Sequence, residues 1–81
     1  MNNQKLQNNI FSTNDLALAT SLSLYIPLLD IDKTNPKRAL FIFQKSKQLD
    51  QLINQYWQGA LQVNPMTFFG QLKVIKTRLY Q

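Results

Sequence analysis

The residues of this chain best suited to chemistry are basic and aromatic, and several fall on one side of a C-terminal helix. The apolar spacing predicts that helix from Pro65 to about Leu79. At 100° per residue, four side chains fall within a sector of about 60° on one flank of the helix: Phe69, Lys73, Lys76 and Tyr80. Lysines neutralise phosphates and aromatic rings stack on unpaired bases, as in proteins that bind single-stranded nucleic acid. We therefore predict a nucleic-acid-binding surface made by these four residues together with Lys37, Arg38 and Arg78.

The two aromatic residues of this flank have a second interpretation. The same helix carries a narrow apolar stripe of Phe68, Leu72, Ile75 and Leu79, and Phe69 and Tyr80 lie beside it. The two rings would then widen the buried face, and the lysines would extend over them into water. A chain of 81 residues needs most of its large apolar side chains inside, which favours burial. The sequence leaves both interpretations open.

The charge balance favours an anionic partner. Nine Lys and Arg residues stand against four Asp and no Glu, which gives a formal charge of +5. Such a balance is typical of proteins that meet nucleic acid or an acidic protein surface. The alternative is that the charge serves solubility alone.

The composition argues against an enzyme. The chain has no Cys and no His, so it lacks a disulfide framework, a thiolate nucleophile, the usual zinc and haem ligands and the common general base. Asp30 and Asp32 lie on one face of a predicted strand and are candidates for a metal site or an acid/base pair. They have too few partners for either role, and pairing with Lys33 or Arg38 is the simpler interpretation. We expect no catalysis, no cofactor and no bound metal.

The first half of the chain predicts a strand, a helix and a β-hairpin. Ile10 to Ser12 is a short strand, and a helix from Asp15 to Tyr25 ends before Pro27 because a residue preceding proline avoids the helical conformation. Two further strands, Leu28 to Asp32 and Ala39 to Phe43, flank a turn-rich loop. The helix is expected to bury Leu18, Leu22 and Tyr25.

The segment from Ser46 to Gly59 carries the clearest helical pattern. Five residues at i, i+3, i+4, i+7 and i+8 share one side of the helix: Leu49, Leu52, Ile53, Tyr56 and Trp57. Ser46 can cap its start, and Gly59 can adopt the left-handed conformation that ends it. We expect this stripe to pack on the sheet, and Trp57→Ala to unfold the domain.

These elements predict one small α+β domain in the order β-α-β-β-α-α, spanning residues 10–81. Residues 1–9 are rich in Asn and Gln and are expected to form a flexible tail. Asn64-Pro65 marks the start of the last helix. The apolar run from Leu16 to Ile31 is interrupted by polar residues and is shorter than the ~20 residues of a membrane span, so we expect no membrane contact and a cytoplasmic location.

Several strings in the chain resemble those of a known family. They are FSTNDLALA from Phe11, PLLDID followed by FIF, YWQGALQVNP from Tyr56, and the closing FF..LK..K.RLY. Together they resemble small bacterial and mobile-element proteins classed as a domain of unknown function. The resemblance implies a compact single domain found alone, and it implies no activity or site residues.

Two functions follow as expectations. The first is a basic, non-enzymatic accessory module that contacts nucleic acid within a nucleoprotein assembly. The second is a protein–protein adaptor or homo-oligomerising module, since a short hairpin leaves sheet edges that can pair with a partner strand. Lys33, Pro36 and Lys37 near the loop discourage such pairing. The sequence does not set the oligomeric state.

Overall fold

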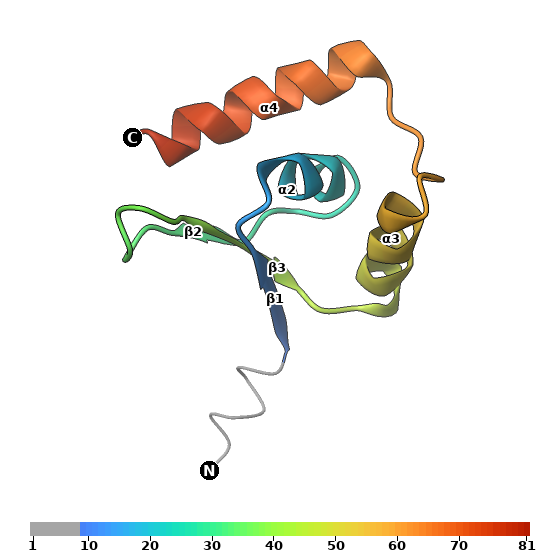
Figure 1. The fold of residues 1–81 in the computed structure, drawn as a ribbon, viewed down its shortest axis with the longest axis horizontal. Helices are drawn as coiled ribbons and strands as arrows, with labels where there is room; N and C mark the ends of the chain where they lie inside the picture. The colour runs from blue at the N-terminus through green and yellow to red at the C-terminus, as the bar shows by residue number, and fades with distance from the viewer. Residues whose placement is uncertain (1–8) are drawn as a thin grey trace.

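Three short strands form an antiparallel sheet with β3 in the middle, in the order β1-β3-β2 (Figure 1). In this computed structural model, which describes residues 9–81, the strands are β1 (Ile10–Thr13), β2 (Asp30–Asp32) and β3 (Leu40–Gln44). The predicted tail of residues 1–9 therefore lies outside the described residues, apart from Asn9. The observed element order confirms the predicted β-α-β-β-α-α arrangement.

The middle strand supplies the sheet's contribution to the core. Successive side chains of a strand point to opposite faces, so Phe41 and Phe43 are buried together, with Ile31 opposite Phe41 in the neighbouring β2. The predicted hairpin of β2 and β3 is confirmed. Its first strand is shorter than predicted, because pairing starts where the Leu29 N–H donates to the Ile42 carbonyl (2.8 Å). The Leu29 side chain is 51% exposed.

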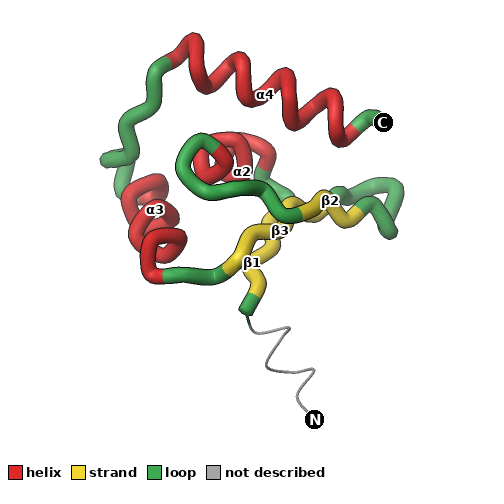
Figure 2. The backbone as a smooth tube through the Cα atoms, turned by 180° about the vertical axis from the view of Figure 1, so that it is seen from behind, coloured by secondary structure: helices red, strands yellow, loops and turns green. Residues whose placement is uncertain are grey.

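The central helix is α2 (Leu16–Ser23), which lies between α3 and α4 and packs against both (Figures 1 and 2). All five residues from Leu18 to Leu22 are buried, including two polar ones. Their hydroxyls remain paired inside the helix: Thr20 donates to the Leu16 carbonyl (2.8 Å) and Ser21 to that of Ala17 (2.9 Å).

The predicted end of α2 needs a correction. The helix starts as expected, with the Asp15 side chain accepting from the Leu18 N–H, but it stops at Ser23 and not at Tyr25. Tyr25 is 46% exposed, and its hydroxyl donates to the Gln62 carbonyl (2.7 Å). The Tyr25 ring was predicted to lie in the core. It lies beyond the end of α2 instead, and its hydroxyl holds the connection between α3 and α4.

The helix α3 (Lys47–Trp57) begins and ends at the predicted residues. The Ser46 side chain accepts from the Leu49 N–H, and Gly59 has a φ of 73°. Leu49 and Leu52 are buried against α2, but Trp57 is 66% exposed, so its predicted burial was wrong. Trp57 occupies the last position of α3, where the chain turns toward α4. Its ring meets the Tyr56 ring edge-on, with 5.0 Å between the ring centroids.

The last helix, α4 (Pro65–Leu79), covers α2 from the other side. Ile75 is fully enclosed, and the Gln71 side chain donates to the Ser23 hydroxyl (3.1 Å). The predicted start is confirmed, because the Asn64 side chain accepts from the N–H groups of Met66 and Thr67 and Pro65 is the first helical residue.

Asn64→Ala is expected to lower the free energy of unfolding by about 1 kcal/mol, because two first-turn N–H groups lose their acceptor. Urea denaturation followed by circular dichroism measures the change. The matched control is Asn54→Ala, an exposed Asn inside α3, expected to stay within about 0.5 kcal/mol of the parent. Equal losses in both variants would contradict the capping role.

Candidate nucleic-acid interface

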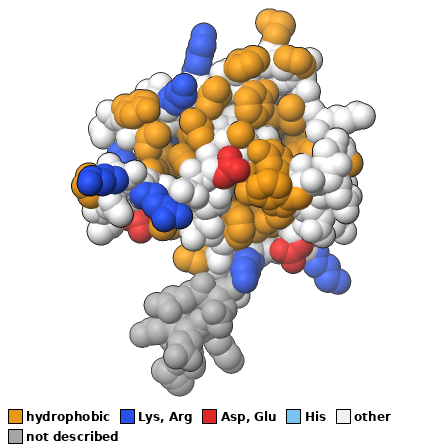
Figure 3. Space-filling model, viewed as in Figure 1, with side chains coloured by type: hydrophobic (Ala, Val, Ile, Leu, Met, Phe, Trp, Pro, Cys, Tyr) orange, Lys and Arg blue, Asp and Glu red, His pale blue; other side chains and the backbone are white. Residues whose placement is uncertain are grey.

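The residues predicted to bind nucleic acid are all exposed, but the structure does not gather them in one place. Three groups result. Phe69, Lys73, Lys76 and Tyr80 lie along one side of α4, which we call the α4 strip. Lys37 and Arg38 lie on the loop between β2 and β3, next to the end of α4. Arg78 lines a separate hollow of the surface. On the face shown in Figure 3, Lys and Arg side chains gather where α4 ends beside this loop.

The rings of the α4 strip do not take part in the core. Phe69 is 59% exposed and Tyr80 is 78% exposed, whereas the neighbouring stripe of the same helix provides the buried Ile75. Burial of the two rings beside that stripe, the second interpretation of the sequence, is therefore wrong. Phe69 meets Phe68 edge-on at 5.6 Å, which steadies its ring. With a rise of about 1.5 Å per residue, Phe69 and Tyr80 lie roughly 16 Å apart along the helix, with both lysines between them.

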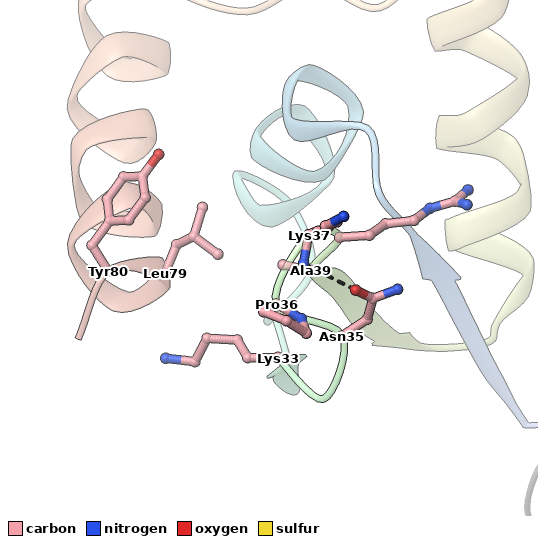
Figure 4. A pocket seen from close by; sticks show the side chains of 8 residues that line it. Lys33, Asn35, Pro36, Lys37, Ala39, Leu79 and Tyr80 are labelled. Atoms are coloured by element: carbon pink, nitrogen blue, oxygen red, sulfur yellow. Dashed lines mark hydrogen bonds between the residues drawn. The ribbon is translucent and has the colours of Figure 1, made fainter.

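The loop of residues 33–39, called here the hairpin loop, is held by its own hydrogen bonds. The Asp32 carboxylate accepts from the Thr34 N–H (2.9 Å), and the Asn35 side chain accepts from the Lys37 N–H (2.9 Å; Figure 4). The Arg38 N–H donates to the Asn35 carbonyl (3.1 Å). The Thr34 hydroxyl and N–H lower the pKa of Asp32 below its usual value, so this carboxylate stays ionised and keeps its turn at neutral pH. The backbone beneath Lys37 and Arg38 is therefore fixed before any ligand binds.

Lys33 ties the hairpin loop to α4, and sequence reasoning missed this role. Its Nζ donates to the carbonyls of Arg78 (3.3 Å) and Gln81 (3.2 Å) at the end of the helix. The last carbonyls of a helix lack helical partners and carry partial negative charge, so an ammonium is well placed there. No local sequence signal reports a contact between residues 45 and 48 positions apart.

A cavity of about 350 Å³, called here the loop–helix pocket, lies between the hairpin loop and the end of α4. Figure 4 shows Lys33, Pro36 and Lys37 on one side and Leu79 and Tyr80 on the other. Arg38 also lines this pocket, and no described carboxylate does. A second hollow of about 200 Å³ shares Lys37, Arg38 and Leu79 and continues toward the start of α2.

Arg78 stands apart from the strip. It lies two positions after Lys76, which turns it by about 200° to the other side of α4. There it lines a hollow of about 160 Å³ together with Asp30 and Lys33. Arg78 was predicted to act together with Lys73 and Lys76. The structure places it in the same helix but on a different surface.

The site's chemistry is electrostatic and apolar. Within residues 9–81, no three His, Cys, Asp or Glu side chains lie close enough together to hold a metal ion. The Asp30 carboxylate accepts from the Ile31 N–H (2.8 Å), and Asp32 is engaged with Thr34. The basic and aromatic surfaces can therefore attract an anion and stack on a flat ring.

The fold and surface define a small α+β domain with an exposed basic and aromatic helix. The chain belongs to a family described as a domain of unknown function (DUF5659), whose model it matches over residues 8–81. This confirms that the chain is a domain of unknown function, as the sequence strings indicated. No curated protein and no solved structure matches the chain. Among residues 9–81, no helix has the length and apolar character needed to cross a membrane.

Proposed function

We propose that this protein is a cytoplasmic, non-enzymatic accessory module that contacts single-stranded nucleic acid along the α4 strip within a nucleoprotein assembly. The observation that carries the proposal is the exposure of Phe69 and Tyr80 on the same side of α4 as Lys73 and Lys76. Two exposed aromatic rings contribute little hydrophobic stabilisation, which a small domain needs, and the buried core forms without them.

The spacing supports a single strand over a duplex. Stacking of an unpaired base on an aromatic ring contributes about 1–3 kcal/mol per base, and lysines between the rings neutralise the intervening phosphates. In a duplex the base faces are already stacked on each other. A duplex can therefore make only the lysine contacts, so we expect it to bind more weakly than a single strand.

The testing experiment is a fluorescence-anisotropy titration of a short oligothymidine and of a duplex. With the two lysines of the strip engaged, single-strand affinity is expected to fall about sevenfold between about 50 mM and about 200 mM salt. Phe69→Leu, which keeps an apolar side chain but removes the ring, is expected to weaken this binding about tenfold. Val74→Ala is the matched control, since Val74 is 51% exposed on α4 but lies outside the strip. Absence of binding at low salt would contradict the proposal.

A second candidate is a protein-interaction module, and two observations favour it. β1 and β2 are the outer strands, so each leaves one backbone edge unpaired within the described sheet. Trp57 also remains 66% exposed at the end of α3. An apolar or edge-paired interface responds little to salt, and light scattering at increasing protein concentration would reveal a second copy.

A further inference from the structure

The α4 strip leads directly into the loop–helix pocket. Tyr80 belongs to both, since it is the last residue of the strip and lines the pocket. Figure 1 shows the loop between β2 and β3 beside the C-terminal end of α4, so a strand that follows the strip meets the loop there. The pocket therefore marks where such a path ends.

The pocket concentrates positive charge. Lys33, Lys37 and Arg38 line it, and among the described residues its lining contains no carboxylate. A phosphate monoester at a strand end carries a charge of about −1.5 to −2 at neutral pH, against about −1 for each internal phosphodiester. Because the Lys33 ammonium is engaged by carbonyls at the end of α4, Lys37 and Arg38 are the two cations left to favour the end of a strand over its interior.

The pocket's two walls are already in position. The turns at Thr34 and Lys37 fix the loop, and Lys33 joins it to the carbonyls of α4. By donating to those carbonyls, Lys33 also offsets the negative helix end, which would otherwise repel an anion. Lys37 and Arg38 are held through their backbone N–H groups, so their side-chain cations are not needed to keep the loop's shape.

We infer that the loop–helix pocket binds the terminal phosphate of a single strand lying on the α4 strip, an inference that rests on the proposed function. Lys37 contacts the phosphate through a charge-assisted hydrogen bond, and Arg38 adds positive charge beside it. Leu79 and the Tyr80 ring pack against the terminal nucleoside. A volume of about 350 Å³ falls within the range of sites for small ligands and suits a nucleotide end.

The test compares three oligothymidines that carry a 5′-phosphate, a 3′-phosphate or no terminal phosphate, each labelled at the unmodified end. One phosphorylated form is expected to bind about tenfold more tightly than the unmodified strand. The double variant Lys37→Gln/Arg38→Gln should lose this preference while still binding all three strands. Its matched control, Lys45→Gln/Lys47→Gln, removes two exposed charges near the start of α3 and should keep the preference.

Three outcomes overturn the inference. Equal affinity for all three strands, with binding still sensitive to Phe69→Leu, would refute the terminal-phosphate site but leave the proposed function standing. A preference abolished by equimolar inorganic phosphate would assign the pocket to free phosphate. Failure of every oligonucleotide to bind would overturn both proposals.

Discussion

Phe43→Ala is expected to lower the free energy of unfolding by about 3 to 5 kcal/mol. Phe43 is completely buried on the middle strand, opposite Phe11 of β1, so its removal leaves a cavity that the sheet and helices cannot close. A chain of this length has a total stability of roughly 4 to 12 kcal/mol. The variant should therefore lose a large share of its stability, as circular dichroism with urea denaturation would show.

The informative comparison is Trp57→Ala, which removes a larger side chain. Because Trp57 is 66% exposed, we expect a loss of at most about 1 kcal/mol and a domain that stays folded. Circular dichroism is the suitable probe for both variants, since an exposed indole reports poorly on unfolding. A destabilisation by Trp57→Ala as large as that by Phe43→Ala would mean that the core is not the one described.

The contrast between these two residues shows what helical spacing can predict. The spacing placed Leu49, Leu52 and Trp57 on one side of α3, but Trp57 lies at the edge of that side, about 140° around the helix from Leu52. It did not show how wide a sector of the helix would be covered: Tyr56 packs partly buried against the core, and Trp57 beside it is exposed. The width of the buried sector depends on the neighbouring elements, which are placed by tertiary packing.

The central position of α2 was also hidden in the sequence, for a different reason. Thr20 and Ser21 look like surface residues, yet both are buried. Each satisfies its hydroxyl within the helix, so polarity gave no warning of burial. Both ends of α3 and the start of α4 were predictable because their signals are local: Ser46, Gly59 and Asn64 act on groups within a few residues.

The candidate site divides in the same way. The side-by-side placement of Phe69, Lys73 and Lys76 follows from helix geometry alone, and the sequence was enough to predict it. The meeting of Tyr80 with Lys37 in one pocket depends on how α4 crosses the domain. The bond from Lys33 to the Arg78 carbonyl depends on the same crossing. Such long-range contacts leave no periodic trace in a single sequence.

Reversing the charges of the α4 strip with Lys73→Glu/Lys76→Glu is expected to weaken single-strand binding about 100-fold at low salt. Two phosphate contacts disappear and two repulsive charges replace them. Both residues are exposed on α4, so the fold should persist by circular dichroism. The neutral pair Lys73→Gln/Lys76→Gln should reduce the slope of log affinity against log salt by about 1.4.

The matched control for this reversal is Lys45→Glu/Lys47→Glu, which changes the net charge by the same amount on exposed residues near the start of α3. If only net charge attracts the strand, the two reversals will weaken binding equally, and the strip will have no special role. If the strip is the contact surface, the α3 reversal will cost a small fraction of the α4 loss when both are measured at about 0.15 M salt, because screening then limits the reach of a charge to about 8 Å. The ratio of the two losses, and not the size of either one, therefore decides whether the rings and lysines of α4 act as one surface.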